Sequence, residues 1–287
     1  MVEQLTKMQN PRIGNASIKV VGVGGGGQNA VNRMYRERVE GVDYIAVNTD
    51  AQALKSAHLP EEHKLRVGDE TARGLGVGGD PSKGKQCHEE NREQIKKLLT
   101  GADLVFVAAG MGGGTGTGGS PVVAEIAQEL NCLTVGVITK PFNFEGQVRS
   151  KKAMEGIEQL SQHVDTMVVI PNDRLMAVSD ENLTMTGAFE MADDVLAQGV
   201  QSIAELILIP GEINLDFADV RAVMENAGPA WMAIGKGTGE DRAVKAAEEA
   251  INSPLLEVEI TGAKGVIFNI TGGSDLTLEE VQKASEV

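Results

Sequence analysis

The sequence is poor in several residue types, and each shortage excludes a class of protein. Aromatic residues make up 3% of the 287 positions, so any core must be built from aliphatic side chains. The two cysteines, Cys87 and Cys132, have no paired spacing, which excludes a disulfide framework and favours reduced thiols in the cytoplasm. No apolar run approaches the ~18 residues of a membrane span, and the polar segment 1–15 lacks the apolar block of a signal peptide, so no direct membrane insertion is expected.

Basic residues are outnumbered by acidic ones. The chain has 26 Lys and Arg against 41 Asp and Glu, a net charge of −15. This excess repels other polyanions, so neither nucleic acid nor an anionic membrane surface is expected as the primary partner. A phosphate ligand would have to be held by backbone N–H groups, helix dipoles, one or two placed cations and a divalent metal.

The lysine-containing phosphate loop G-x-x-x-x-G-K-[ST] is also missing, but another glycine-rich segment is present. Residues 110–121, GMGGGTGTGGSP, lie between the apolar run Leu104–Ala109 and the helix-like run Val122–Ala127. A turn between a buried strand and a helix N-terminus presents backbone N–H groups to an anion. The segment therefore predicts a phosphate-binding loop, with Pro121 in the first helical turn.

Two further glycine loops occur, at 22–27 and at 74–81. The first satisfies G-x-G-x-x-G between a strand, Ile18–Val23, and a helix that we expect to open at Ala30. Because ligands of parallel sheets bind outside the carboxyl ends of the strands, the three loops should converge on one edge. A single loop of this kind, with Asp50 at the end of the next strand, is typical of an NAD site. A nicotinamide oxidoreductase is therefore the alternative to a protein that binds a nucleoside triphosphate. The second, larger Gly/Thr loop favours a triphosphate held from two sides.

Strands and helices alternate through about residue 175, which predicts an α/β fold with a Rossmann-like, mostly parallel sheet. A long helix follows at 187–209, apolar nearly all round in its C-terminal half and stopped by Pro210-Gly211. Beyond it we expect a loop and helix at 214–226, strands at 232–235 and 265–270, and helices at 242–251 and 278–285.

Four segments are predicted from this pattern. They are a flexible N-terminal arm at 1–16, a nucleotide-binding domain at 17–184, a central core helix at 185–210, and a second, smaller α+β domain at 211–287. The helix at 81–99 is expected to be continuous and to have a polar face.

Several polar side chains could complete a site. Asn172 follows the strand 166–170 and could bind a base edge or cap a turn; Phe189 could stack on a base or belong to the core. Asn214, Asp216 and Asp219 follow the long helix, where they could cap the next helix or position a water for attack on phosphate. Since a helix of ~20 residues is ~30 Å long, these carboxylates could act only on a nucleotide in a neighbouring molecule.

These motifs in this order resemble the tubulin/FtsZ family of assembly GTPases. The motif Gly112–Gly118 is similar to the tubulin signature, and the resemblance runs from about Ile18 to the C-terminus. It also includes the segments 24–29, 47–54, 140–146, 170–173 and 214–220.

The resemblance implies a GTP- and GDP-binding GTPase that polymerises head to tail into the protofilaments of the division ring. It implies that the synergy loop, with Asn214, Asp216 and Asp219, completes hydrolysis in the next subunit, with Mg²⁺ or K⁺ offsetting charge. No separate protein-only metal site is expected. The nucleotide-binding residues implied are Gly25, Gly26, Gly27, Gln28, Asn29, Gly112, Gly113, Gly114, Thr115, Gly116, Thr117, Gly118, Glu145, Arg149, Asn172, Phe189 and Asp194.

The sequence departs from the family pattern at three places. Gly119-Ser120 stands where many relatives carry two alanines, and Gln28 stands where glycine or asparagine is common. The family's second domain continues past Val287 and ends in a tail that binds membrane anchors, so we expect a C-terminally incomplete domain without that tail site. A GTP-binding polymer subunit with little hydrolysis is the alternative function. The expected location is the cytoplasm at mid-cell, or the chloroplast stroma for an organellar protein.

Overall fold

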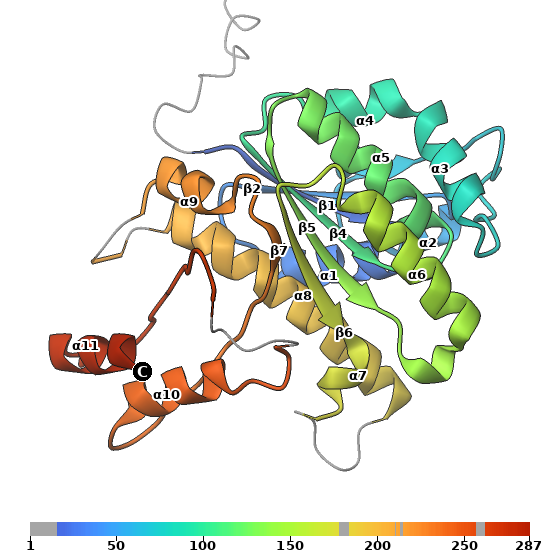
Figure 1. Ribbon diagram of the computed structural model, residues 1–287. Helices are drawn as coiled ribbons and strands as arrows, with labels where there is room; N and C mark the ends of the chain where they lie inside the picture. Colours follow the sequence, from blue (N-terminus) through green and yellow to red (C-terminus); the bar gives the residue numbers. More distant parts are fainter. Residues whose placement is uncertain (1–15, 178–183, 210, 213–214, 257–261) are drawn as a thin grey trace, which may run out of the picture.

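The computed structural model describes residues 16–177, 184–209, 211–212, 215–256 and 262–287, and its centre is a seven-stranded sheet (Figure 1). The strand order is β3-β2-β1-β4-β5-β6-β7, and every neighbouring pair is parallel. The predicted parallel sheet is therefore confirmed. The strands are β1 (Ile18–Val23), β2 (Val42–Asn48), β3 (Lys64–Arg66), β4 (Leu104–Gly110), β5 (Leu133–Lys140), β6 (Thr166–Pro171) and β7 (Gly228–Ala230).

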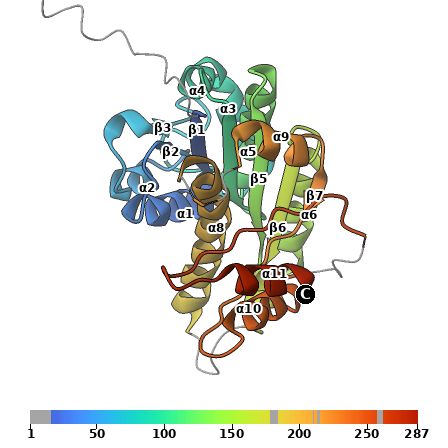
Figure 2. The same ribbon diagram turned by 90° about the vertical axis from the view of Figure 1, so that its left-hand side faces the viewer.

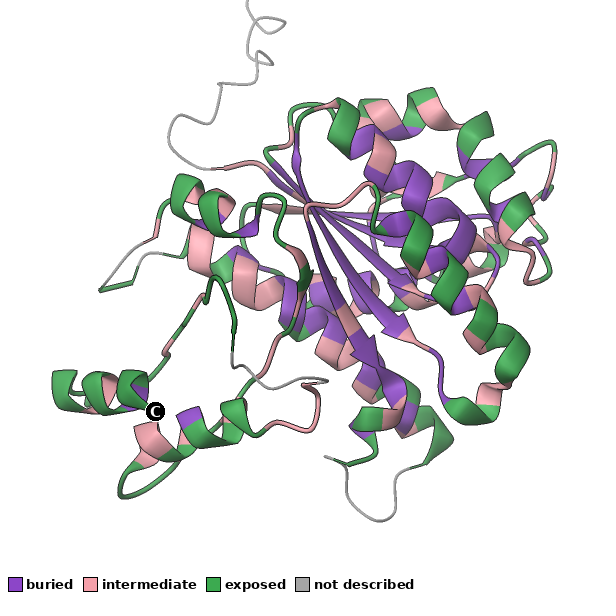
Figure 3. Cartoon of the chain, in the orientation of Figure 1, coloured by how far each residue is buried: buried purple, intermediate pink, exposed green. Residues whose placement is uncertain are grey.

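Helices cover both faces of the sheet, and the central strands are buried on both sides (Figure 3). One core lies under α1 and α8, and the other lies under α3 to α6. Both cores are mainly aliphatic, as the shortage of aromatic residues predicts, and the first also contains Tyr44 and Phe106. The helices are α1 (Gly24–Arg36), α2 (Ala51–Ser56), α3 (Pro81–Glu90), α4 (Arg92–Leu99), α5 (Thr115–Glu129), α6 (Gln147–Leu160), α7 (Asn172–Leu175), α8 (Met185–Leu208), α9 (Phe217–Met224), α10 (Arg242–Ile251) and α11 (Leu278–Glu286).

Helix α8 is the longest element described, with 24 residues, and it lies alongside α1 (Figure 2). Its N-cap, Thr184, accepts a hydrogen bond from the backbone N–H of Gly187. One stripe at four-residue spacing is buried, including Ala188, Ala192 and Leu196. The long helix predicted from the sequence is confirmed, but its C-terminal half is half-buried rather than enclosed.

The predicted helix at 81–99 is wrong as a single element. It breaks at Asn91, whose side-chain oxygen accepts a hydrogen bond from the backbone N–H of Gly68. This contact ties the break to the turn after β3. A polar residue at a helix junction can satisfy backbone groups in this way, and the apolar periodicity on either side does not reveal it.

The strands predicted at 232–235 and 265–270 are also wrong. Neither forms a ladder in the part of the chain that the structure describes. Gly235 packs directly on α10, since a Cβ built there would lie 1.9 Å from the carbonyl oxygen of Ala246. The chain therefore packs against a helix where a neighbouring strand was expected, and the described part of the region beyond β7 contains only helices and loops.

Strand β7 was missed because Gly228, Pro229 and Ala230 are not typical strand residues. It pairs with the first half of β6 and forms the edge of the sheet, where proline is tolerated because one side of the strand needs no ladder donor. Helices α10 and α11 pack against each other, away from the sheet (Figure 1).

Candidate functional site

Two glycine turns meet at the carboxyl edge of the sheet. Strands β1 and β4 are neighbours in register, with Val23 opposite Ala109, so the turns after them begin at the same level. A Cβ built at Gly24 would lie 2.7 Å from the nitrogen of Gly116, and one built at Gly26 would lie 3.1 Å from the Cα of Gly110. Only glycine allows the two backbones to approach this closely. The predicted convergence of these loops is confirmed.

The helices begin earlier than predicted. Helix α1 starts at Gly24 rather than Ala30, and α5 starts at Thr115, so Pro121 is the seventh residue of α5 and not part of its first turn. The glycines therefore belong to helix N-termini, whose first N–H groups have no partner within the helix. A Cβ built at Gly25 or Gly113 would meet no atom within 4 Å, so backbone at both turns faces open space.

The third glycine loop supports the second. A Cβ built at Gly114 would lie 2.5 Å from Val77 Cγ2 and 2.8 Å from the nitrogen of Asp80. Helix α3 follows this loop and packs closely on α5, because Gly84 and Gly118 bring the two backbones together. All three loops thus form one assembly, as predicted.

Threonine hydroxyls fix the second turn from within. The hydroxyls of Thr49 and Thr115 are 2.6 Å apart and join the end of β2 to the start of α5. The backbone N–H of Gly112 donates to the hydroxyl of Thr117 at 2.8 Å. The threonines therefore brace the loop, and their hydroxyls are already used inside the protein.

Gln28 and Asn29, two neighbouring candidates on α1, differ in exposure. Gln28 is buried; its side chain accepts from Asn48 at 2.9 Å and donates to the carbonyl oxygen of Ala53 at 2.7 Å. Its amide therefore serves the fold. Asn29 is exposed and points out of the core.

Glu145 and Arg149 lie against the second turn. The Glu145 carboxylate is buried, accepts from the backbone N–H of Phe142 at 2.9 Å, and pairs with Arg149 at 3.1 Å. A Cβ built at Gly112 would lie 2.7 Å from Arg149 Cγ, so this arginine runs along the turn. Its half-exposed guanidinium is the cation nearest to the glycine turn among these candidates.

Beyond this pair are three aromatic rings and one buried amide oxygen without a hydrogen-bond partner. Phe142 stacks on Phe144, with ring centroids 5.1 Å apart, and Phe189 meets Phe142 edge-on at 5.5 Å. Phe144 and Phe189 remain exposed in part. Asn172 is buried, and its side-chain oxygen has no hydrogen-bond partner, so it has capacity for a ligand donor.

Asp194, on α8, is already paired. Arg33 of α1 binds its carboxylate through two nitrogens, with Nη2 2.7 Å from Oδ2 and Nε on Oδ1. Sequence reasoning missed Arg33, although it lies four residues after Asn29 and so shares its helix face.

Next to this pair, burial raises the pKa of Asp193 to about 7. Arg33 opposes that rise, while Asp194 and Glu190 add to it.

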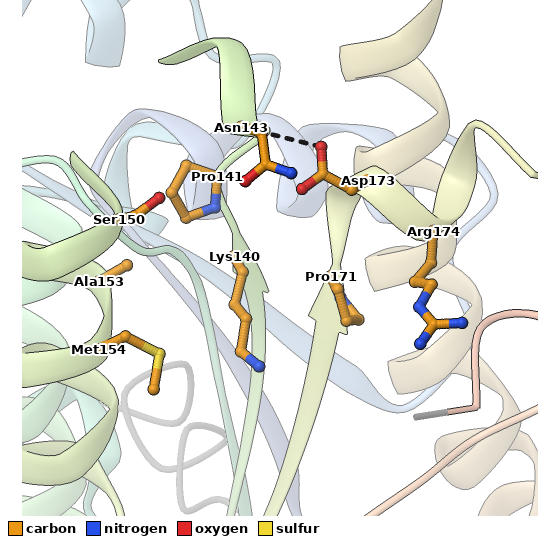
Figure 4. A pocket seen from close by; sticks show the side chains of 9 residues that line it. All are labelled: Lys140, Pro141, Asn143, Ser150, Ala153, Met154, Pro171, Asp173 and Arg174. Atoms are coloured by element: carbon orange, nitrogen blue, oxygen red, sulfur yellow. Dashed lines mark hydrogen bonds between the residues drawn. The ribbon is translucent and has the colours of Figure 1, made fainter. Parts of the chain in front are cut away.

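A cavity of about 290 Å³ opens beside the turn, at the carboxyl ends of β5 and β6 (Figure 4). Arg149 and Asn172 flank it in sequence, but neither lines it. The Asp173 carboxylate accepts from the backbone N–H of Asn143 at 3.0 Å and so joins the two strand ends. The lining residues are Lys140, Pro141, Asn143, Ser150, Ala153, Met154, Pro171, Asp173 and Arg174.

Asp216 and Asp219 lie at the opposite edge of the sheet. Helix α9 packs at the strands' amino ends, where the Thr166 hydroxyl, on the first residue of β6, donates to the carbonyl oxygen of Met224. Asp216 and Asp219 cap this helix reciprocally, each accepting from the other's backbone N–H. Asn214, predicted to be the possible cap, lies outside the described residues, and Asp216 has that role.

The capping leaves part of each carboxylate available. Asp216 and Asp219 are exposed, and within the described residues one oxygen of each accepts no hydrogen bond.

The described residues contain no cluster of three His, Cys, Asp or Glu side chains that could hold a metal. None of the described helices is long and apolar enough to cross a membrane.

Comparison with known proteins gives the same assignment along the chain. Residues 17–180 match the Tubulin/FtsZ family, GTPase domain, and residues 228–287 match the FtsZ family, C-terminal domain. A mutant FtsZ from M. jannaschii is 47% identical with a TM-score of 0.91, over 95% of this chain and 81% of that one. An empty FtsZ dimer from M. jannaschii is 46% identical with a TM-score of 0.90, over 99% and 80%. The GTPγS-bound CetZ2 protofilament from Haloferax volcanii shares the fold, at 22% identity and a TM-score of 0.69 over 83% and 73%.

Proposed function

Because this chain belongs to the tubulin/FtsZ family, we propose that it binds and hydrolyses GTP and polymerises head to tail as a cytoskeletal protein. The observation that carries the proposal is the separation of two half-sites. The glycine turns lie at the carboxyl edge of the sheet, and Asp216 and Asp219 lie at its amino edge. One copy cannot bring the two together, whereas two stacked copies can.

The proposed nucleotide site has three parts. Gly25 to Asn29 and Gly112 to Gly118 hold the phosphates through backbone N–H groups at two helix N-termini, which suits a chain of net charge −15. Glu145 and Arg149 contact the ribose and phosphate region. Asn172, Phe189 and Asp194 bind guanine; the unpaired Asn172 oxygen and the partial exposure of Phe189 support this. In this site Mg²⁺ would be bound chiefly by the phosphates and waters.

Hydrolysis is proposed to occur between copies. The free oxygens of Asp216 and Asp219 would accept hydrogen bonds from a water and orient it toward the γ-phosphate of the copy below. Asn214 belongs to the same proposed loop. The capping box holds both carboxylates in fixed positions at the start of α9, which is the property a water-positioning pair needs.

Two finer proposals follow from the family. We propose that the filaments build the division ring and that the protein works in the cytoplasm at mid-cell. The FtsZ dimer and the CetZ2 protofilament among the similar structures support self-association.

The first experiment is GTP turnover per subunit as a function of protein concentration, with sedimentation in GTP and Mg²⁺ on the same samples. We expect turnover to rise above a threshold concentration at which the protein also begins to sediment. Turnover per subunit that stays constant at all concentrations would contradict shared sites. Bound GTP with negligible turnover throughout would favour the non-hydrolysing polymer subunit.

A mixing experiment separates the half-sites. Asp216→Ala should abolish turnover with GTP affinity near that of the wild type, whereas Gly25→Val should weaken GTP binding because its side chain enters the open space at the turn. Mixed together, the two variants should recover part of the activity, since one supplies the turn and the other the carboxylate. Two folded variants that recover nothing would overturn hydrolysis in trans.

A further inference from the structure

The cavity at the carboxyl ends of β5 and β6 combines apolar side chains with positive charge. Figure 4 shows Ala153 and Met154 of α6 on one side of it, Arg174 on the other, and Lys140 and Pro171 between them. Met154 and Arg174 are both exposed. In a chain of net charge −15, the lining has two basic side chains against one aspartate. None of the lining residues belongs to the proposed nucleotide site, so the cavity is left without a role there.

Helix α9 lies at the amino ends of the same two strands. Arg221 donates to the carbonyl oxygen of Asn131, two residues before β5, at 3.3 Å. The hydroxyl of Thr166, the first residue of β6, donates to the carbonyl oxygen of Met224. The helix therefore crosses from β5 to β6 toward its C-terminus. A copy stacked along the strand direction would present this part of α9 to the cavity of the copy below.

The spacing along α9 agrees with the carboxylate positions in the proposed function. Asp219 and Glu225 are six residues apart, or about 9 Å along the helix axis. Strands β4 and β6 are two positions apart in the sheet, or about 10 Å. If Asp219 lies over the turn that follows β4, Glu225 therefore lies over the end of β6, where the cavity opens.

The exposed side of α9 has the chemistry that this cavity fits. Ala222 and Val223 are exposed and match the apolar side chains of α6 in kind. Glu225 follows them, half-exposed and paired with Arg221 of its own helix. The described charged residues between 212 and 225 are four acids and one arginine, so the amino edge is acidic where the cavity lining is basic. Opposite charges of this kind favour one orientation of two copies.

We propose that the cavity is a docking site for a second copy of this chain, which places Val223 of α9 against Met154 and Glu225 near Arg174. The inference rests on the proposed function, because it takes head-to-tail stacking as given. It adds a contact between copies outside the nucleotide site, made by residues that touch neither the phosphates nor the acidic pair.

The first test measures proximity in the full chain. Met154→Cys and Val223→Cys together introduce two exposed thiols, whereas the natural Cys87 and Cys132 are buried. In GTP and Mg²⁺ a short bis-maleimide should link copies of this double variant into a ladder on a denaturing gel. Either single variant should give no ladder, and neither should Val223→Cys combined with a cysteine at the exposed Lys85 of α3. Double-variant protein that sediments but forms no ladder overturns the inference.

The second test exchanges charges. Arg174→Glu should raise the threshold for GTP-dependent sedimentation by roughly threefold or more, because it places a carboxylate opposite Glu225. Lys85→Glu makes the same change of charge away from the cavity and should stay close to the wild type. Adding Glu225→Lys to Arg174→Glu should recover much of the loss. A threshold unchanged by Arg174→Glu, or a double variant no better than Arg174→Glu alone, overturns the docking contact.

Fluorescent GDP separates this inference from the proposed function. Each variant should bind GDP like the wild type, since the cavity residues do not contact the nucleotide; loss of GDP binding by Arg174→Glu would place Arg174 in the nucleotide site instead. A wild type that binds GTP but never sediments overturns head-to-tail assembly, and the docking contact with it. A wild type that sediments while the ladder and the charge exchange both fail overturns the docking contact alone.

Discussion

Gly119 shows how one residue adapts this chain to its own neighbours. A Cβ built there would lie 2.1 Å from the imidazole ring of His88, which is completely buried between α3 and α5. From its resemblance to the family, the sequence is expected to carry alanine at this position. The geometry explains why glycine stands there, because the His88 ring fills the space that an alanine methyl group would need.

Gly119→Ala should therefore destabilise the protein by about 1–3 kcal/mol, the usual cost of overpacking a core. Adding His88→Ala should recover much of that loss, because it removes the ring that clashes. The measurement is denaturant unfolding of wild type, both single variants and the double variant, which gives their coupling free energy. Additive effects of the two substitutions would contradict the proposed contact.

The same histidine makes stability depend on pH. Burial lowers the pKa of His88 to about 4, a change that the hydrogen bond from Nδ1 to the carbonyl oxygen of Gly84 opposes. In the unfolded chain the imidazole takes up a proton near pH 6.5, whereas in the folded protein it does so only near pH 4. Keeping His88 neutral therefore contributes fully to the free energy of unfolding above pH 6.5. This contribution falls as pH drops toward 4, by roughly 3 kcal/mol in all.

The measurement is the free energy of unfolding between pH 4.5 and 7.5 in wild type and in the double variant His88→Ala, Gly119→Ala. The wild type should lose more stability on acidification than the double variant. Asp193 has the opposite sign, since its raised pKa costs stability as pH rises toward 7, but it is present in both proteins and cancels. Parallel curves would show that His88 is not the group responsible.

Individual side chains were the hardest level to predict from sequence. The glycines of the two turns after β1 and β4 were predictable, because the close approach of the two backbones requires glycine. The partners of Gln28, Arg33 and His88 were not, since each depends on an element distant in the chain. The site residues themselves stay a prediction until nucleotide binding is measured.

At the scale of elements, α6 holds the third glycine loop. Lys152 donates to the carbonyl oxygen of Gly79 at 2.6 Å. The loop contains four glycines with positive φ, at 74, 76, 78 and 79, and its first half is hydrogen-bonded to residues 49–51, so Lys152 adds a restraint at the opposite end. The Lys152 side chain thus links α6 to the loop that supports Gly114.

Lys152→Met should keep the apolar stem and remove this tether. Amide hydrogen exchange in residues 74–80 should become faster by about threefold or more, with little change in α6 itself, because local opening would need less free energy. Lys151→Met, at an exposed neighbouring position, is the control. Unchanged exchange in the loop would mean that contacts around Val77 and Asp80 suffice.

The sheet was predictable because its strands are short apolar runs separated by glycine turns and amphipathic helices. Helix starts within glycine runs were not, since glycine is usually read as a loop residue and only the neighbouring turn reveals its role. The extended segments around Met232 and Phe268 carry strand-like residues, but strand formation also needs a partner, which the described residues do not supply.

At the scale of the whole molecule, the net charge of −15 should oppose association of identical copies. Raising the ionic strength from about 0.01 M to about 0.1 M shortens the screening length from about 30 Å to about 10 Å. We therefore expect the threshold concentration for GTP-dependent sedimentation to fall over this range. Sodium and potassium salts should be compared, to separate screening from a specific effect of K⁺. A threshold that rises with salt would indicate that attractive ion pairs dominate the interface.

Helix α8 also determines a length that can be measured from outside the molecule. It has 24 residues and so extends about 36 Å, from beside the proposed guanine site to the turn before α9. If each copy places its acidic pair on the phosphates of the next, the axial repeat of a filament cannot be much shorter than this helix. Deleting one turn of α8 would shorten the spacing by about 5 Å, and diffraction from aligned filaments would detect the change.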